Sequence, residues 1–322
     1  MSTPAQDTRA VEISVRQMRE ADLPAARSIL RLAFGTFIGV PDPTSFAADK
    51  EYVATRWNAN PSAALVAEGN GAVVGSNFAS HWGSFGFFGP LTVRPELWNR
   101  RVAQKLLAAT MDLFEAWRVR EAGLFTFAHS ARHVHLYQKF GFWPRLLTAI
   151  MEKPTSATRP GVWLKYSDLD ESEREQVLDA CRALTDSILE GLDVRLEIQS
   201  VERQRLGDTV VLWDGDVLDA FAVCHCGEGT EAGAHTCYVK FAAVRPGQDM
   251  ERRFDQLLKA CEALAVERGL KRLEAGVNLA RSRAYRSLLQ QGFRTAMQGV
   301  AMQCADSPGF NRPDVFIADD WR

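Results

Sequence analysis

Apolar and polar positions along the chain follow two different periods, and together these predict an α/β protein. Val11, Ile13 and Val15 alternate with polar residues, which is the period-two pattern of a strand. From Asp22 to about residue 34 the apolar positions recur every three to four residues, which predicts a helix with one buried face. Further along, the pattern predicts a hairpin turn at 69–71, a long helix ending near residue 120, a short helix at 132–139 and a last strand at 146–153.

The second half of the chain repeats this order of elements. Its pattern predicts a strand at 162–166, a helix at 171–189, a hairpin around 214–216, a strand at 238–244, a long helix at 250–268 and a closing strand at 297–304. Val93-Arg94-Pro95 recurs as Val244-Arg245-Pro246, and Gly141-Phe142 recurs as Gly292-Phe293, both 151 residues later. Two markers at one offset predict a duplicated domain.

The boundaries of the two copies follow from composition. Residues 154–161 (PTSATRPG) read as a linker, so the expected domains are 1–153 and 162–304. A tail, residues 305–322, lies outside the repeat, and its apolar residues 315–317 and Trp321 predict that it packs on the body. The length of 322 residues suits two domains of about 150 residues.

Charge and hydropathy exclude several classes of partner. The net charge of −2 implies no general attraction to nucleic acid or to anionic lipid. No apolar run approaches the roughly 20 residues of a membrane span, and the first ten residues lack the apolar core of a signal peptide. We therefore expect a cytoplasmic protein, a monomer or homodimer, with no nucleic-acid or membrane partner.

The stretch 91–107 (LTVRPELWNRRVAQKLL) predicts an anion site. A strand end meets Pro95, a polar turn follows, and a helix begins near Val102. The first turn of a helix presents unpaired backbone N–H groups, which bind anions. Arg100, Arg101 and Lys105 are disfavoured there by the helix dipole alone, so a bound negative group would explain them.

The element order, the Val93-x-Pro95 strand end and Tyr137 four residues before Gly141-Phe142 resemble the GNAT acyltransferases, and the likeness covers nearly the whole chain as two copies. The resemblance implies two tandem domains, each a mixed, mostly antiparallel twisted sheet flanked by helices. It also implies acetyl-CoA as co-substrate and transfer of its acetyl group to an amine, here of a small molecule.

The resemblance assigns roles by position. Tyr137 would protonate the departing thiolate, and His81 or a water would accept the proton of the amine. The expected coenzyme-binding residues are Leu91, Thr92, Val93, Trp98, Asn99, Arg100, Arg101, Val102, Ala103, Gln104, Ser130 and His133. The expected acceptor-binding residues are Phe34, Phe37, Asp42, Trp57 and Trp82.

The second copy departs further from the family pattern than the first. At the constant offset, Arg252 stands at the first glycine position, Phe254 at the final small position and Leu288 in place of the tyrosine. We therefore assign coenzyme binding to the first copy. The alternative is a silent acyl-CoA-binding or protein-interaction module, which Trp98 and Arg101 in the loop favour. Another acyl donor or a hydroxyl acceptor also remains open.

No resident metal is expected. Cys224-His225-Cys226 and His235-Thr236-Cys237 contain ligand types that suit zinc. In a symmetric hairpin Cys224 would face Cys237 and Cys226 would face His235. The spacing is not a standard zinc motif, so buried thiols are the preferred interpretation and zinc is the alternative.

Overall fold

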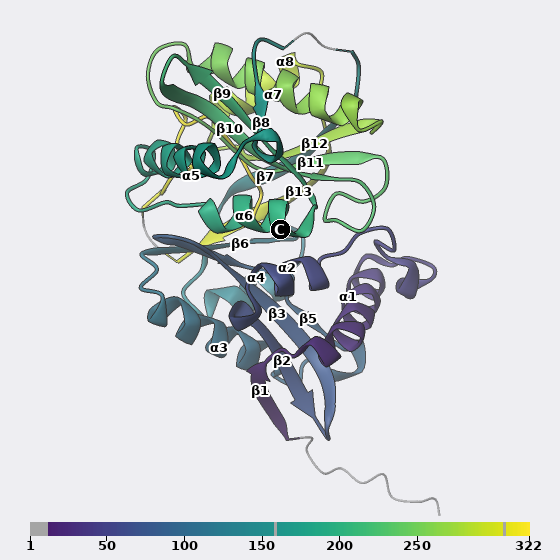
Figure 1. Ribbon diagram of the computed structural model, residues 1–322. Helices are drawn as coiled ribbons and strands as arrows, with labels where there is room; N and C mark the ends of the chain where they lie inside the picture. Colours follow the sequence, from purple (N-terminus) through teal and green to yellow (C-terminus); the bar gives the residue numbers. More distant parts are fainter. Residues whose placement is uncertain (1–11, 158–159, 305–306) are drawn as a thin grey trace, which may run out of the picture.

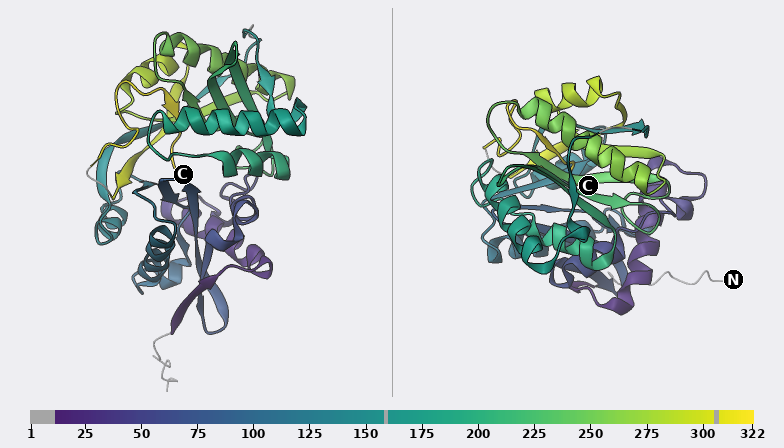
Figure 2. Two further views of the ribbon diagram at one scale, coloured as in Figure 1. Left: turned by 60° about the vertical axis from the view of Figure 1, so that its left-hand side comes forward. Right: turned by 45° about the horizontal axis from the view of Figure 1, so that its top comes forward.

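A computed structural model describes residues 12–157, 160–304 and 307–322. The first ten residues, on which the signal-peptide argument depends, and two residues of the expected linker lie outside these ranges. The two halves of the chain stack on one another, and Arg322 lies between them (Figures 1 and 2).

The first half contains the elements that its hydrophobic pattern predicts, with shifted ends. Its strands are β1 Ile13–Gln17, β2 Ala64–Gly69, β3 Ala72–Trp82, β4 Phe85–Phe88, β5 Thr92–Val93, β6 Glu121–Thr126 and β7 Trp143–Pro154. Its helices are α1 Leu23–Ile38, α2 Val53–Ala59, α3 Val102–Ala116 and α4 Ala131–Gln138. The sequence pattern of residues 46–57 also predicts one helix, but α2 starts only at Val53, after a separate 3-10 turn at Pro43–Ser45 that Asp42 caps.

The second half repeats this order. Its strands are β8 Leu164–Lys165, β9 Gly207–Asp214, β10 Val217–Cys226, β11 Thr236–Val244, β12 Arg272–Asn278, β13 Arg294–Gln303 and β14 Ile317–Ala318, and its helices are α5 Glu171–Asp186, α6 Arg195–Gln204, α7 Met250–Glu267 and α8 Ser282–Gln290. Helix α6 is absent from the pattern-based prediction. It is the counterpart of α2 and lies beside it, where Gln204 donates to the carbonyl of Thr55 over 3.0 Å.

The fold class is the expected α/β class, but the two sheets are joined into one. The order is β1-β2-β3-β4-β6-β13-β7-β12-β11-β10-β9-β8, with β5 on β3 and β14 on β11. Strand β13 of the second half thus lies beside β6 of the first, and β7 of the first half lies beside β12 of the second. Each half lends its last long strand to the other, and the two lent strands pair antiparallel at the centre (Figure 1).

A shared core joins the halves on one face of this sheet. The Trp82 ring packs on Phe87 of its own half and on Phe241 of the second half, with centroids 4.7 and 5.1 Å away. Helices α5 and α6 and the tail residues Ile317 and Trp321 complete the same buried cluster. The prediction that the tail packs on the body is confirmed, since residues 315–321 are all buried.

Candidate functional site

A wedge-shaped cleft opens in the first half where two parallel strands separate. Strands β4 and β6 pair from Phe85 opposite Glu121 to Phe87 opposite Gly123. The chain then bends at Gly89-Pro90, and β5 stays with β3 instead of β6. The bend therefore leaves one side of residues 91–93 without a strand partner, facing the gap.

This cleft contains an open cavity. Its walls come from α1, β5, α4 and the end of β6, and none of the described residues that line it is acidic. The lining residues are Ala33, Phe34, Phe37, Leu91, Thr92, Val93, Trp98, Ala103, Phe127, Arg132, His133, Leu136 and Tyr137. The structure thus brings the expected acid and eight further expected site residues, including the strand end 91–93, into one cavity.

Tyr137 lies on α4 against the apolar wall of the cleft. Its side chain is 7% exposed and packs on Phe88, with ring centroids 5.8 Å apart. Burial raises the pKa of the Tyr137 hydroxyl above its ordinary value, while a side-chain hydrogen bond with Thr126 opposes this shift. Tyr137 is therefore a protonated donor throughout the neutral and moderately alkaline range.

His133 lies one helical turn before Tyr137 on the same face of α4, and it also lines the cavity. Its ring centroid is 4.8 Å from that of Phe37 on α1. Desolvation lowers the pKa of His133 below its ordinary value, and the neighbouring Arg132 and His129 act in the same direction. The imidazole is thus neutral at pH 7 and able to accept a proton.

A second cavity of about 660 Å³ adjoins the first around the start of α3. Three basic residues line it, Arg101, Arg132 and Lys139, and no described residue in its lining is acidic. Helix α3 begins after Arg101 with no side-chain cap, so the N–H groups of its first turn are not capped by a side chain. These groups lie together at the position where the sequence predicts an anion site.

The loop residues take different positions around this anion site. Arg101 occupies the left-handed region at φ 62°, which explains why a glycine is the usual residue there. Trp98 turns inward, donates from Nε1 to the carbonyl of Val93 over 2.9 Å and carries Arg132 on its ring at 5.1 Å. Asn99, Val102 and Gln104 line the cavity with Arg101.

Three of the expected anion-site residues lie outside both linings. Arg100 is exposed and is not among the lining residues. Lys105 donates from Nζ to the carbonyl of Ile13 and so ties α3 to β1. Ser130 caps α4, where its hydroxyl accepts from the N–H of His133 over 3.4 Å.

Other expected site residues lie apart from the cleft. His81 lines a different cavity between the halves, beside Arg56, Glu231 and Lys240, and its ring stacks on Trp117 at 4.8 Å. Burial lowers the pKa of His81 below its ordinary value. Trp82 is in the shared core.

Two more expected acceptor residues have structural partners. Trp57 donates to the carbonyl of Met18 over 3.3 Å, and Asp42 caps an exposed turn. Sequence reasoning missed Phe127, Arg132, Leu136 and Lys139, although the spacing of 132, 136 and 139 along α4 is a helical-face signal.

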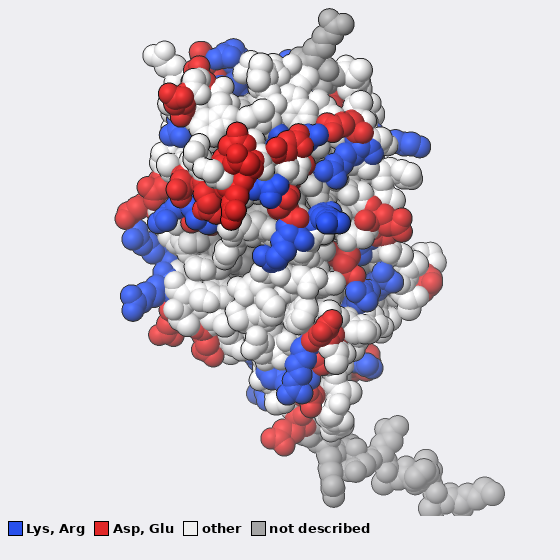
Figure 3. Space-filling view, in the orientation of Figure 1, with Lys and Arg blue, Asp and Glu red and all other residues white. Residues whose placement is uncertain are grey.

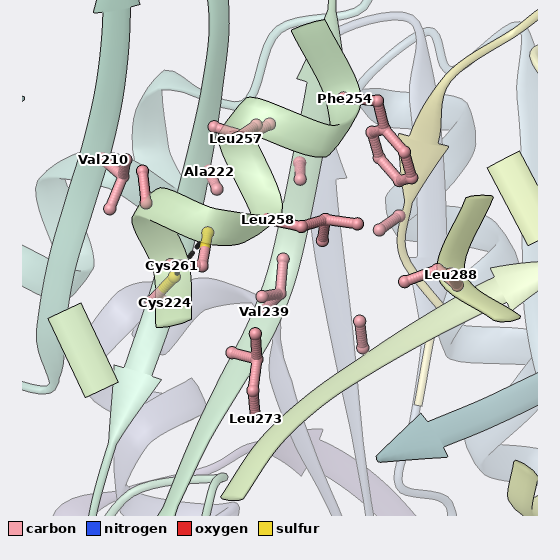
Figure 4. Close-up of a cluster of buried hydrophobic side chains, with 14 of the residues drawn as sticks. Val210, Ala222, Cys224, Val239, Phe254, Leu257, Leu258, Cys261, Leu273 and Leu288 are labelled. Atoms are coloured by element: carbon pink, nitrogen blue, oxygen red, sulfur yellow. Dashed lines mark hydrogen bonds between the residues drawn. The ribbon is translucent and has the colours of Figure 1, made fainter. Parts of the chain in front are cut away.

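The start of α7 corrects one part of the comparison between the copies. Helix α7 begins after Asp249, at φ 62° like Arg101, so the loop before it is three residues shorter than the loop before α3. Phe254 therefore does not face the place of the phosphates. It is fully buried on the sheet side of α7, near Leu257, Leu258 and Leu288 (Figure 4).

The cysteine constellation also differs from its expected arrangement. A bulge between Val223 and Cys224 shifts the register, so Cys226 lies opposite Cys237 and Cys224 lies opposite Val239. Cys226 and Cys237 are free thiols with sulfurs 3.8 Å apart. Within residues 12–157, 160–304 and 307–322, no group of three or more His, Cys, Asp or Glu is arranged to hold a metal ion.

The chain is similar in sequence and in fold to known proteins. Residues 25–142 match the model of the acetyltransferase (GNAT) family. A GCN5-related N-acetyltransferase from Sphaerobacter thermophilus shares 14% identity at a TM-score of 0.56, covering 90% of this chain and 95% of its own. A tandem GNAT protein from the clavulanic acid biosynthesis pathway shares 13% identity at 0.55, covering 92% and 100%. No curated protein matches the sequence.

A protein of Pyrococcus horikoshii, provisionally described as an acetyltransferase, has a TM-score of 0.67 at 12% identity and covers 98% of this chain and 96% of its own. Fold and cleft thus define a two-copy α/β protein. Residues 25–142 match the acetyltransferase (GNAT) family, and the whole chain shares the fold of tandem GNAT proteins. None of the helices in the described ranges is long and apolar enough to cross a membrane.

Proposed function

We propose that this protein is an N-acetyltransferase whose first half moves the acetyl group of acetyl-CoA to the amine of a small molecule. The observation that carries the proposal is the continuous cleft of the first half. An anion cavity with three basic residues at its start passes into an apolar cavity that ends at Tyr137 and His133. An extended thioester with a phosphorylated end matches this order of surfaces.

The residues of the cleft divide the reaction between them. The basic cluster Arg101, Arg132 and Lys139 binds the pyrophosphate, and backbone amides of residues 91–93 hold the pantetheine arm and polarise the thioester carbonyl. The neutral amine attacks the carbonyl carbon as the carbon–sulfur bond breaks. Tyr137 gives its proton to the departing sulfur.

The proton lost by the amine needs an acceptor within reach of the cleft. His81 was the sequence-based candidate, but it lines the cavity between the halves. His133 lies in the cleft beside Tyr137, and its depressed pKa keeps the ring neutral at pH 7. The geometry therefore favours His133 as the base, and it adds a catalytic role to a residue first expected only to bind coenzyme.

The acceptor end of the cleft is aromatic. Phe34 and Phe37 of α1 meet Phe127, with ring centroids 6.2 and 4.9 Å apart. Such a wall suits an amine carried on an apolar or aromatic body, because ring faces attract both apolar groups and cations. Asp42, another expected acceptor residue, is exposed, accepts hydrogen bonds from Thr44 and is not among the residues that line the cleft.

A silent acyl-CoA-binding module is the second candidate, because Trp98 is turned onto the Val93 carbonyl at the strand end that should hold the pantetheine. One experiment separates the two functions. Acetyl-CoA is titrated calorimetrically into wild type and Tyr137→Phe, and both are assayed against a panel of small aromatic and aliphatic amines. If the protein is an enzyme, wild type and Tyr137→Phe should bind acetyl-CoA equally, and turnover should be reduced about 10²–10⁴-fold in Tyr137→Phe. Binding without turnover in wild type would support the silent module.

A further inference from the structure

The cleft of the second half contains part of the chain itself. Strands β11 and β12 pair in parallel from Thr236 opposite Arg272 to Val239 opposite Ala275 and then separate. This register is that of β4 and β6 moved by 151 residues, since Phe85 and Glu121 form the matching pair. The wedge beyond it is filled by the segment Val315–Arg322, which we call the tail strand.

The tail strand lies on the backbone edge that the first half leaves open. Ala242 and Ala243 pair antiparallel with Ala318 and Ile317, and Val244 donates to the carbonyl of Phe316 over 3.1 Å. These three residues correspond to Leu91, Thr92 and Val93, which line the open cleft of the first half. The second cleft thus binds an extended peptide where the first presents an unpaired strand edge.

The side chains of the second cleft recognise this peptide closely. Arg281 occupies the N-cap position of α8, as Ser130 does in α4, but its side chain does not cap the helix. Its fully buried guanidinium instead donates to the carbonyl of Ile317 over 2.9 Å and pairs with Asp319. Arg283 covers the ring of Phe316 at 5.2 Å. Basic and apolar groups of the groove therefore meet acidic and apolar residues of the tail strand.

Two further contacts leave little free space. The Tyr238 hydroxyl donates to Asp320 over 3.0 Å, and a Cβ built on Gly276 of β12 would lie 2.3 Å from the Cβ of Asp320. Residues 315–321 are each at most 5% exposed. No room remains in this wedge for a pantetheine arm.

We propose that the second cleft is a binding groove for an extended peptide in which acidic residues follow an apolar run, filled in cis by the tail strand, which excludes acyl-CoA from the second half. The exclusion of acyl-CoA rests on the function proposed above, whereas the peptide groove does not.

The groove is tested first in the full chain by hydrogen exchange. Amides of 315–321 should exchange at least 100-fold more slowly than the exposed amide of Ser307 in wild type. Gly276→Ala, which places a methyl group against Asp320, should accelerate the exchange of 315–321 at least 10-fold. Adding Asp320→Gly, which removes the clashing Cβ, should recover part of this loss. Equal exchange of 315–321 and Ser307 in wild type, or no change in Gly276→Ala, would overturn the groove.

A peptide added in trans is the second test. A chain ending at residue 314 should gain thermal stability with a synthetic peptide of residues 312–322, and an Asp319→Lys peptide should give none. Equal stabilisation by both peptides would contradict the recognition by Arg281. If the shortened chain does not fold, the Gly276→Ala measurement still decides.

Acetyl-CoA titration of the full chain then tests the exclusion. We expect one molecule of acetyl-CoA to bind per chain. Its binding should slow amide exchange at 91–104 and leave amide exchange at 242–250 unchanged. Protection of 242–250 or release of the tail strand by acetyl-CoA would overturn it. If acetyl-CoA does not bind at all, the proposed function is refuted. The peptide groove is then judged by the hydrogen-exchange and peptide measurements alone.

Discussion

The two clefts of this protein share one strand geometry but differ in the groups that face the gap. In the first, the helix start carries Arg101, and Arg132 and Lys139 lie across the cavity from it. In the second, the corresponding helix start carries Asp249, and Arg252 and Arg283 are already paired with Asp249 and Glu251 at 3.7 and 3.6 Å. A free positive cluster can bind phosphate, whereas a neutralised one cannot compete for it.

The apolar ends of the clefts differ in the same sense. Tyr137 of the first cleft is replaced by the fully buried Leu288 in the second, and the tail strand takes the edge that residues 91–93 leave free. The duplicated fold thus keeps its backbone geometry while its two openings present different surfaces. The face in Figure 3 shows charges of both signs interspersed.

The largest expected effect comes from separating the halves. A fragment of residues 1–157 lacks β13, which pairs with both β6 and β7. We expect no cooperative unfolding of this fragment, a loss of on the order of 10 kcal/mol of stability, measured by circular dichroism during urea titration. Co-expression with residues 158–322 should restore cooperative unfolding. A folded, monomeric fragment would show that the exchanged strands are dispensable.

The second effect concerns the base of the first cleft. His133→Ala should lower turnover about 10²–10³-fold with acetyl-CoA affinity nearly unchanged, while His81→Ala should keep turnover within a factor of three. Because the pKa of His133 is depressed, the acid limb of its rate profile should lie below pH 6.5 and should vanish in the variant. Initial rates between pH 5 and 9 test this. A large loss in His81→Ala alone would return the role to His81.

The third effect uses the cavity between the halves, where His225 stands at the strand position of Ser80 in the first half. Its ring is buried, neither nitrogen has a hydrogen-bond partner among the described residues, and desolvation lowers its pKa to about 3. Below pH 6.5 the unfolded chain therefore binds a proton that the folded chain refuses, and stability falls by about 1.4 kcal/mol per pH unit.

The variant His225→Ser introduces the residue that the first half has at this strand position. It removes the group that binds a proton only in the unfolded chain. Between pH 7 and pH 5 its free energy of unfolding should fall by about 2 kcal/mol less than that of wild type. Urea denaturation of both proteins at the two pH values measures the difference. Parallel losses in the two proteins would mean that the His225 ring does not cause the acid sensitivity.

The smallest effect tests the charge contrast at the two helix starts. Arg101→Glu should weaken acetyl-CoA binding about 10- to 100-fold, because one charge-assisted contact to phosphate becomes repulsive. Asp249→Lys, the matched change in the second half, should leave both affinity and stoichiometry unchanged while the tail strand fills its cleft. Isothermal titration gives both values. A second acetyl-CoA bound by Asp249→Lys would show that charge, and not the tail strand, closes this cleft.

Much of the first cleft was predictable because it depends on local features. The strand end before Pro95, the helix beginning at Val102 and the spacing of Tyr137 to Gly141 are read within a few residues of one another. Trp82 and Trp57 were not predictable in this way, because an aromatic residue at a strand or helix end fits a core as well as a pocket. Their neighbours, Phe241 and Met18, come from distant parts of the chain.

The sequence by itself determined the duplication, the order of elements and the class of fold, since these depend on periodicity and on markers at a constant offset. The tertiary structure alone decided that β7 and β13 change places and that the tail strand enters the second cleft. The physical reason is that a strand edge accepts any extended segment of suitable pattern, so the choice of partner depends on which segment the rest of the fold brings to it.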